Sequence, residues 1–260
     1  MKVATWNVNS IRTRLDHVTH WLQENPVELL CLQETKVVDG SFPQEAFQEM
    51  GYHCYVYGQK SYNGVALISR EAIPVYNGFG GILGAEAVGD LDEQKRVITG
   101  IYGDTCVVNV YVPNGSSVGS EKYQYKLQWL ELLRQYLAHL LERYGAVNVC
   151  GDFNIALEDI DIYDPKGKQN HIMASEQERQ ALRQVLALGL QDAFRKFYRD
   201  GGHYSWWDYR AASFRRNLGW RIDHHYLSPD LYGRAQDCRI DVGPRKLEKP
   251  SDHAPVIVEY

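Results

Sequence analysis

Apolar residues in this chain come in short runs, and several of these runs end in polar side chains. Residues 3–9 alternate between apolar and polar positions, residues 29–32 are continuously apolar, and residues 146–150 are nearly so. Such runs are typical of strands that bury one face or both faces. The run at residues 255–259 follows Asp252-His253, which predicts a turn leading into an inward-facing strand. We therefore expect four strands that deliver polar groups at their ends.

The rest of the chain alternates between helical and strand-like periods. Helical spacing of apolar residues predicts helices near residues 15–25, 45–50, 122–144 and 176–188. Further strands are expected at residues 53–57, 65–69, 96–101, 106–112, 204–207, 221–227 and 239–242. Asn63-Gly64 predicts a hairpin between two of them, whereas residues 74–89 are rich in glycine and show no pattern, and residues 159–168 are expected to form an exposed loop. Without a linker, repeat or low-complexity tract, residues 1–260 are predicted to form one domain with a two-layer β core and helices outside.

Composition narrows the class of protein. The 260 residues are 44% hydrophobic and 23% charged with a net charge of -5, so a polyanion would have to meet a local basic face. Five cysteines, odd in number and without zinc-ligand spacing, indicate free thiols in a reducing cytoplasm. No apolar run approaches the roughly 20 residues that cross a bilayer, and residues 1–9 fit a first strand better than a signal peptide.

The polar strand ends are the candidates for chemistry. Each has an ordinary explanation when taken alone: a capped turn, a solvated Asp-His pair, or Glu34 paired with Lys36. Together they form a demanding set, because alternation places Asn7 beside Asn9 and the two-residue spacing places Asp152 beside Asn154. The expected site contains Asn7, Asn9, Glu34, Tyr111, Asp152, Asn154, Asp223, Asp252 and His253.

Carboxylates and amides with one histidine suit Mg²⁺ or Mn²⁺, which prefer oxygen ligands, whereas a zinc site would need more histidine or cysteine. Hydrolysis of a phosphodiester requires charge neutralisation at the phosphate, an activated water and a stabilised leaving oxygen. The expected site offers groups for all three tasks, and no serine or cysteine triad competes with it.

One segment resembles a nucleic-acid interface. Between residues 204 and 227, aromatic residues interleave with arginines: Trp206, Trp207, Tyr209, Phe214 and Trp220 with Arg210, Arg215, Arg216 and Arg221. Arginine binds phosphate, and aromatic rings receive unstacked sugars or bases. The alternative is an aromatic hairpin that faces the core, with the arginines solvated outside. Lys122 and Lys126 of the long helix are expected on a solvated face, or beside a phosphate path.

Seven segments together are similar to the exonuclease III family of abasic-site endonucleases, in order and over nearly the whole chain. They are WNVNSIR, LLCLQETK, NGVALIS, YVPNG, VCGDFNIA, GWRIDHHYLS and SDHAPV. GDFN and SDHAPV are shared with the wider endonuclease/exonuclease/phosphatase superfamily, whereas WNVN, QETK, YVPNG and WRID are more specific to exonuclease III.

The resemblance implies an α/β fold with four layers, an α/β/β/α sandwich of two packed mixed sheets flanked by helices. It also implies a DNA phosphodiesterase of base-excision repair that uses Mg²⁺ or Mn²⁺. Such an enzyme cuts double-stranded DNA 5′ to abasic sites, trims 3′ ends and removes 3′-phosphates. We further expect a cytoplasmic monomer.

The resemblance also implies roles for the metal site. Glu34, with Asn9 and Asp252 nearby, would hold the metal. Asp152 would orient or deprotonate the attacking water.

Other members of the set would act on the phosphate. Asn154 and His253 would contact it, Asp223 would orient His253, Asn7 would support that network, and Tyr111 would assist at the phosphate or leaving group.

The binding pocket follows from the same motifs. Trp206, Trp220 and Ile222 would receive the flipped-out sugar, Asn114 would lie near its phosphate, and Arg210 is a candidate contact from the aromatic segment.

Two departures from the family pattern carry consequences. Asn9 stands where some relatives carry Asp, which predicts a weaker hold on the metal. Residues 168–175 do not match the usual loop, which predicts unequal abasic incision and 3′-end processing, with weak incision as one alternative.

Two further alternatives are a phosphatase that acts on a small phosphoester such as an inositol phosphate, and a nucleic-acid-binding protein with an inert site. The segment rich in tryptophan and arginine argues against the first, and the complete set of acids, amides and histidine argues against the second.

Overall fold

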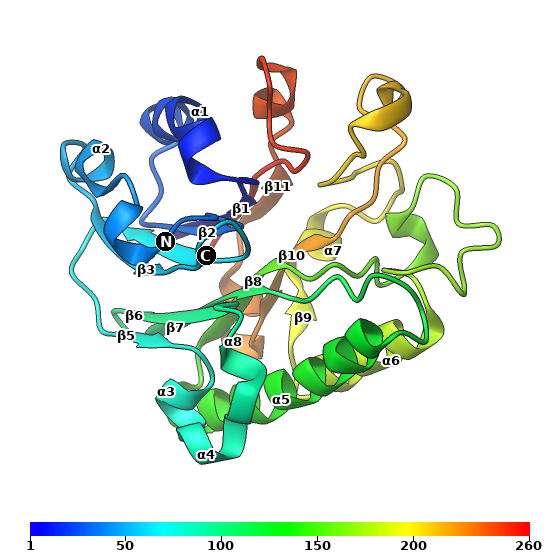
Figure 1. The fold of residues 1–260 in the computed structure, drawn as a ribbon, viewed down its shortest axis with the longest axis horizontal. Coiled ribbons are helices and arrows are strands. Elements are labelled where there is room, and N and C mark those ends of the chain that lie inside the picture. The colour runs from blue at the N-terminus through cyan, green and yellow to red at the C-terminus, as the bar shows by residue number, and fades with distance from the viewer.

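Two six-stranded mixed β-sheets form the centre of the molecule in this computed structural model, which describes all residues from 1 to 260 (Figure 1). The first sheet has the order β11-β12-β1-β2-β4-β3 and the second β5-β6-β7-β8-β10-β9. The strands of the first sheet are β1 (Lys2–Asn7), β2 (Leu29–Gln33), β3 (His53–Tyr57), β4 (Val65–Ser69), β11 (Asp237–Ile240) and β12 (Val256–Glu259). Those of the second are β5 (Val75–Asn77), β6 (Val97–Tyr102), β7 (Thr105–Tyr111), β8 (Val147–Asp152), β9 (Gln191–Asp192) and β10 (Asp223–Leu227).

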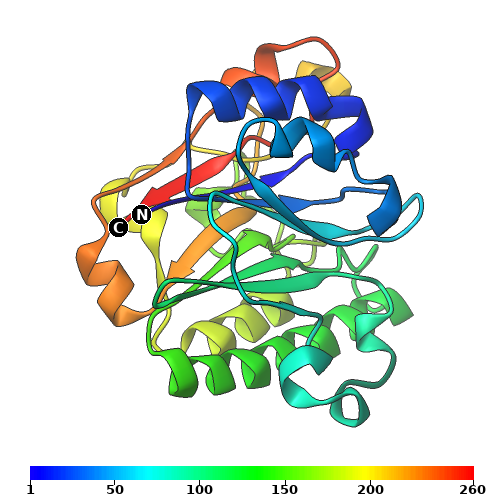
Figure 2. The same ribbon diagram turned by 90° about the vertical axis from the view of Figure 1, so that its left-hand side faces the viewer.

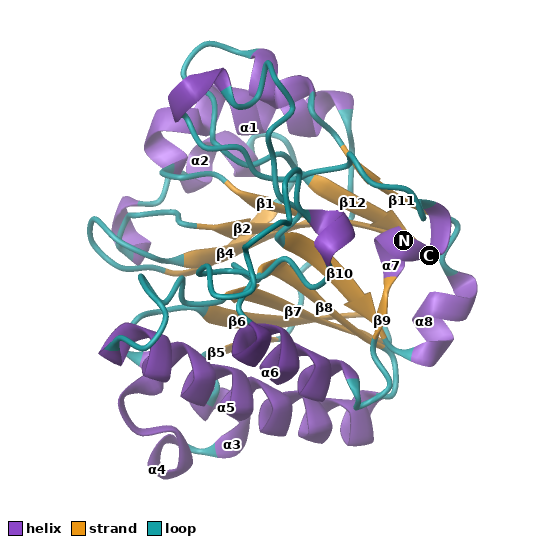
Figure 3. Ribbon diagram, turned by 90° about the vertical axis from the view of Figure 1, so that its right-hand side faces the viewer, coloured by secondary structure: helices purple, strands orange, loops and turns teal.

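Helices cover the outer face of each sheet, so the molecule has four layers (Figures 2 and 3). α1 (Ile11–Glu24) and α2 (Gln44–Gln48) lie over the first sheet. α5 (Glu121–Tyr144) and α6 (Glu176–Leu186) lie over the second, with α3 (Gly80–Leu83) and α4 (Ala85–Val88) beside them. The two short helices α7 (Ala193–Phe197) and α8 (Pro229–Arg234) flank the β9–β10 side, and 3₁₀ turns complete the loops at Asp39–Ser41, Gly89–Asp92, Asp159–Asp161, Arg210–Ala212 and Gly243–Lys246.

Three apolar clusters occupy the spaces between the four layers. The middle one joins the inward faces of the two sheets and includes Cys31, Leu67, Val107 and Cys150. The outer two pack α1 and α2 on the first sheet and α5 and α6 on the second. Burial of the apolar side chains in these clusters supplies the main driving force for folding.

Strand register gathers the polar strand ends at one edge. Asp152 of β8 lies opposite Tyr111 of β7 and Asp223 of β10. In the other sheet, Asn7 lies opposite Gln33, so Glu34 leaves β2 next to the end of β1. The sequence motifs therefore meet because the strands that carry them end together.

Most predicted elements are present with small shifts at their ends. The predicted strand at residues 3–9 ends at Asn7, because Asn9 adopts a left-handed backbone with φ of 44°, so simple alternation does not place Asn7 and Asn9 on one face. Residues 204–207 contribute only isolated bridges, from Trp206 to Trp220 and His253. The hairpin at Asn63-Gly64 is confirmed, although its loop is seven residues long, from Gly58 to Gly64.

One expectation for the loops was wrong, because the stretch at residues 74–89, which was expected to be a loop, forms β5, α3 and α4. The loop at residues 159–168 is mostly exposed as expected, but it buries Asp161 and Ile162. The five cysteines carry free thiols, and four of them are buried. No helix combines the length and the apolar character that crossing a membrane demands.

Candidate active site

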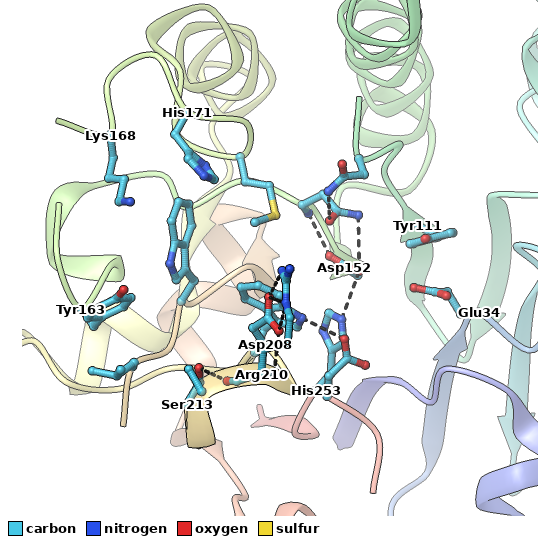
Figure 4. A pocket seen from close by; sticks show the side chains of 18 residues that line it. Glu34, Tyr111, Asp152, Tyr163, Lys168, His171, Asp208, Arg210, Ser213 and His253 are labelled. Carbon is cyan, nitrogen blue, oxygen red and sulfur yellow. Dashed lines mark hydrogen bonds and ion pairs between the residues drawn. The ribbon is translucent and has the colours of Figure 1, made fainter. Parts of the chain in front are cut away.

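A cavity of about 810 Å³ opens at the edge where the strand ends meet. Figure 4 shows Glu34 and Tyr111 on one side of it and Tyr163, Lys168 and His171 on the other. Its lining residues are Glu34, Tyr111, Asn114, Asp152, Asn154, Tyr163, Lys168, His171, Met173, Trp206, Asp208, Arg210, Ala211, Ser213, Leu218, Trp220, Asp252 and His253. The cavity thus contains most of the residues predicted from the sequence.

Asn7 joins the two sheets at the floor of the cavity. Its Nδ2 donates to Glu34 Oε1 at 2.8 Å and to Asp152 Oδ2 at 2.9 Å. Its Oδ1 accepts from the backbone N–H of Asn9 at 3.0 Å. Because Asn7 is fully buried, this amide fixes the two carboxylates relative to one another.

His253 lies between two acids. Its Nδ1 is 2.9 Å from Asp223 Oδ2, and its Nε2 is 3.7 Å from Asp152 Oδ2. Burial alone would lower the pKa of His253, but the carboxylates of Asp223 and Asp152 outweigh it and raise that pKa to about 10. His253 is therefore an imidazolium at neutral pH, with Nε2–H directed to the side of Asp152 and the cavity.

Asp152 is buried with little solvent to stabilise its charge. Burial raises the pKa of Asp152 to about 7, against the opposing effect of the His253 imidazolium and the hydrogen bond from Asn7. A carboxyl group with this pKa can both accept and hold a proton near neutral pH, as a general base must.

Glu34 belongs to a chain of contacts that continues to the cavity wall. Lys36 Nζ lies 2.8 Å from Glu34 Oε2 and donates to Asn9 Oδ1 at 2.6 Å. Asn9 Nδ2 donates to Asp252 Oδ1 at 3.1 Å, and Trp206 Nε1 donates to Asp252 Oδ2 at 3.0 Å. Burial would raise the pKa of Glu34, but the ammonium of Lys36 and the amide of Asn7 lower it overall, so Glu34 stays ionised.

The amide of Asn154 holds Asp152 in place. Its backbone N–H donates to Asp152 Oδ1 at 2.9 Å, while its Nδ2 donates to Val112 O at 2.9 Å and to Asp152 Oδ2 at 3.4 Å. Asn114 Nδ2 in turn donates to Asn154 Oδ1 at 3.2 Å. The Asp-x-Asn motif thus makes the local turn contacts expected of it and also builds the site.

Tyr111 supplies a neutral hydroxyl. Burial and the negative charges of Glu34 and Asp152 raise the pKa of Tyr111 well above its usual value, while the Arg96 guanidinium packs 4.6 Å from the centre of its ring. The hydroxyl therefore keeps its proton and remains a hydrogen-bond donor.

The backbone around the site is unusual. Asn9, Glu34, Lys36 and Asn154 all have φ between 44° and 56°, a left-handed region that costs residues with a Cβ about 1 kcal/mol or more each. Gly151 has φ of 145°, and a Cβ there would lie 1.9 Å from Val110 O. Only glycine fits in front of Asp152, and the surrounding packing holds the other residues in their strained conformation.

The donor set fits a hard divalent cation. One ligand atom from each of Glu34, Asp152 and His253 lies within 4.8 Å of the others. Carboxylate oxygens are the ligands that Mg²⁺ and Mn²⁺ prefer. An imidazolium has no lone pair to offer, so Glu34 and Asp152 are the donors of this group, and a nearby cation would keep Asp152 ionised.

The structure thus groups Glu34 with Asp152, whereas the sequence predicted Asn9 and Asp252 as its partners. Asn9 is connected to Glu34 through Lys36, whose ammonium contacts both side chains, and Asn9 donates a hydrogen bond to Asp252. Their contribution to a metal site stays a prediction.

Aromatic rings form the wall opposite the acids. Trp206 and Trp220 line the cavity, and the His171 ring lies 5.3 Å from the ring of Trp220. Ile222, predicted to line the pocket, is instead buried behind this wall in a cluster with Trp220. Arg210 lies at the rim of the cavity with its side chain 88% exposed. Its Nη2 pairs with Asp208 Oδ2 at 2.5 Å.

Two cations predicted to lie at the surface are buried. Arg221 is 1% exposed and pairs with Asp161 at 2.8 Å and Asp192 at 2.7 Å, so it belongs to the protein interior and not to a DNA interface. Lys126 is 0% exposed and pairs with Glu178, so the predicted solvated face was wrong for this residue. Of the aromatic residues, Trp207 is likewise in the core, whereas Tyr209 is exposed.

Comparison with known proteins identifies the family of this chain. A family model described as Endonuclease/Exonuclease/phosphatase family matches residues 4–253. The chain belongs to this family. The exodeoxyribonuclease III of Haemophilus influenzae is 33% identical over 273 residues, which cover 100% of both chains.

Solved structures of the family superpose over the whole chain. A variant of the 3′ phosphatase NExo from Neisseria, bound to product DNA hairpin, has a TM-score of 0.95 at 43% identity and covers 100% of this chain and 99% of its own. An AP endonuclease from Archaeoglobus fulgidus has a TM-score of 0.94 at 41% identity with the same coverage. The predicted exonuclease III relationship, the four-layer fold and the class of hydrolytic DNA-processing enzyme are confirmed.

Some residues of this family site were not predicted from the sequence. Lys168, His171 and Met173 come from the loop whose sequence departs from the family pattern, and that departure was the only sign of their place in the cavity. Asp208 lies two residues before Arg210 and gave no sign at all. Lys126 shares the spacing of Leu130, Leu133 and Leu137, so its position on the apolar side of the helix was visible in the sequence.

Proposed function

We propose that this enzyme hydrolyses phosphodiester bonds of double-stranded DNA with Mg²⁺ or Mn²⁺, both 5′ to abasic sites and at 3′ ends. One observation carries the proposal: Glu34, Asp152 and His253 meet at the floor of a cavity whose wall is Trp206 and Trp220. Acids and an imidazolium suit phosphate chemistry, and the rings suit a sugar or a base turned out of the helix.

Asp152 is assigned to the attacking water. Its carboxylate is held at both oxygens by Asn7 and Asn154, so its direction is fixed before substrate arrives. Beside a bound cation the carboxylate would be ionised, so it would be free to take the proton of that water. This division of work agrees with the role that the sequence resemblance gave it.

His253 and Tyr111 are assigned to the phosphate and the departing oxygen. The His253 imidazolium, oriented by Asp223, offers Nε2–H and positive charge to a phosphate oxygen. The neutral Tyr111 hydroxyl can donate a hydrogen bond to the departing oxygen. Tyr111 comes from β7, on the other side of β8 from the strand that carries Asp223. Asn114 borders the same space.

Glu34 and Asp152 would hold the metal, with Asn9 and Asp252 as further candidates. A bound divalent ion would supply positive charge to the oxygens of the scissile phosphate. Without it, the grouped carboxylates of Glu34, Asp152 and Asp252 would repel a substrate anion, which disfavours binding.

The wall is assigned to the abasic sugar or the terminal nucleotide. Trp206 and Trp220 line the cavity, and Arg210 at the rim can pair with a backbone phosphate. Relatives support both substrates, since one is a 3′ phosphatase and another an AP endonuclease. His171 and Lys168 line the same cavity from the loop whose sequence departs from the family pattern, which supports unequal rates on the two substrates.

The test offers three substrates side by side with Mg²⁺: a duplex with a reduced abasic analogue, a duplex with a 3′-phosphate at a recessed end, and an inositol phosphate. We expect products from both DNA substrates, none with EDTA, and none from the inositol phosphate. Asp152→Asn should lower the DNA rates by about 10²-fold or more. Asp104→Asn, an exposed acid at the β6–β7 turn, is the matched control and should leave the rates unchanged. Hydrolysis of the inositol phosphate alone would replace the proposal with the phosphatase alternative.

We also propose that the enzyme acts as a cytoplasmic monomer in base-excision repair. Free buried cysteines support a reducing compartment. Light scattering of the purified protein should give the mass of one chain, and a dimer mass would refute this part.

A further inference from the structure

A lysine without solvent contact lies behind the cavity. Lys126, in the second turn of α5, has a side chain that is 0% exposed. Its Nζ has three N–H donors and three acceptors: Glu178 Oε1 at 2.5 Å, Asn154 O at 2.8 Å and Asn114 O at 3.1 Å. A buried ammonium is expensive to desolvate, so this arrangement requires full pairing.

The two carbonyl groups belong to separate loops of the site. Asn154 follows Asp152 at the end of β8, and Asn114 follows the end of β7. Their side chains line the cavity and bond to each other at 3.2 Å, while both carbonyls point back to the same ammonium. Lys126 therefore ties the two loops together on the side away from the substrate.

Glu178 connects this ammonium to a third loop. Its Oε1 also accepts from Met173 N at 3.1 Å, and its Oε2 accepts from Ser175 N at 3.2 Å and Ser175 Oγ at 2.5 Å. The loop from Lys168 to Ser175 carries Met173 and His171 into the cavity wall. One buried ion pair between α5 and α6 thus restrains all three segments, and Figure 1 shows these two helices side by side beneath them.

Two backbone positions beside the Lys126–Glu178 pair have unusual conformations. Asn154 has φ of 49°, a conformation that a residue with a side chain keeps only when its surroundings hold it. Gly115 has φ of 89°, and a Cβ there would come within 3.2 Å of the Lys126 side chain. The lysine stem therefore packs directly under the loop of Asn114.

We propose that Lys126 and Glu178 are positioning residues for the hydrolytic reaction, which set the direction of Asn154 and, through it, of the Asp152 carboxylate. The inference rests on the proposed function, since it concerns the same site. It goes beyond that function because neither residue lines the cavity. Displacement of a reacting group by about 1 Å is enough to cost up to about 10²-fold in rate.

A purely structural role makes a different prediction. A buried ion pair that merely supports the fold is often replaced by uncharged residues of similar size at little cost, so a folded variant would react at the normal rate. A positioning role predicts a slow chemical step in a folded protein that still binds DNA and metal.

The experiment compares the parent with the double variant Lys126→Met/Glu178→Gln, which removes both charges together. The control is Glu131→Gln/Arg134→Met, which neutralises an exposed ion pair of 2.7 Å on the same helix. Single-turnover rates are measured on the abasic-analogue duplex with saturating enzyme, and DNA affinity, Mn²⁺ affinity by calorimetry, and folding by circular dichroism are measured in parallel.

We expect the double variant to lose about 10- to 100-fold in single-turnover rate, with DNA and Mn²⁺ affinities within about threefold of the parent and no change in the control. A folded double variant with the parent's rate overturns the inference. If the double variant does not fold, Lys126→Arg keeps a cation paired with Glu178 but replaces the three donors of the ammonium by a planar guanidinium, which cannot contact the Asn114 and Asn154 carbonyls in the same geometry. That variant should be several-fold slower, and a parental rate again overturns the inference. A parent protein inactive on DNA would instead refute the proposed function.

Discussion

His253 Nδ1 lies 2.9 Å from Asp223 Oδ2, and both side chains are shielded from solvent. The carboxylates of Asp223 and Asp152 raise the pKa of His253 to about 10 in spite of its burial. Because this value lies above the ordinary one near 6.5, the interaction stabilises the folded protein fully below about pH 6.5. That contribution is lost as the pH rises through about 10.

Asp223→Asn should therefore lower the pKa of His253, since burial would then act with less opposition. The measurement is an NMR titration of the His253 ring in metal-free protein with EDTA. The variant should also lose activity at a lower alkaline pH than the parent, because the imidazolium that faces the phosphate disappears earlier. An unchanged ring titration would show that Asp223 does not control the charge of His253.

The sequence predicted the cavity-facing part of this site well because each contributing residue lies at one end of a buried strand. Asn7, Glu34 and Asp152 lie at or directly after the ends of apolar runs whose burial the pattern predicts. Asp223 is the first residue of β10, which runs antiparallel to β8 and therefore begins where β8 ends. The type of each residue and its position at a strand end were therefore enough to predict these members of the site.

The supports behind the site were not predictable in the same way. Arg221 and Lys126 are buried because Asp192 and Glu178, far away in sequence, neutralise them. Helical spacing places Lys126 on the apolar side of α5, but a cation is usually solvated, and only the tertiary partner makes its complete burial possible. The left-handed backbone conformation at Asn9 and Glu34 also depends on tertiary packing, and the pattern of apolar and polar residues does not indicate it.

Asn9→Asp tests the neutral amide in the metal network. Asn9 Nδ2 donates to Asp252 Oδ1 at 3.1 Å, so an aspartate there would bring two carboxylates together, relieved only in part by Lys36. We expect Mn²⁺ to bind about tenfold more tightly by calorimetry, because ligand charge tunes affinity for hard cations. The melting temperature without metal should fall. Asn9→Ala controls for loss of the amide, and equal Mn²⁺ affinities in the parent and Asn9→Asp would contradict the expectation.

Trp220→Phe tests the wall of the cavity. The ring of Trp220 lies against His171 on the side opposite Glu34, where an extrahelical sugar would be received. Loss of part of this contact should reduce abasic incision about tenfold more than removal of a 3′-phosphate, a difference in the range of one pocket contact. Both rates are measured on the same preparation. An equal decline of the two would mean that the wall does not distinguish the substrates.

Arg221→Met should destabilise the protein by about 3–5 kcal/mol, because it leaves Asp161 and Asp192 buried without their shared cation. The guanidinium lies 2.8 Å from Asp161 Oδ1 and 2.7 Å from Asp192 Oδ2, and Asp161 has only Arg195 as a further cation. The measurement is urea unfolding followed by circular dichroism. Arg216→Ala, an exposed arginine of the same segment, should change the free energy of unfolding little. The comparison of the two variants therefore distinguishes a buried structural arginine from an exposed one. A stable Arg221→Met variant with weakened DNA binding would restore the original assignment of Arg221 to the DNA interface.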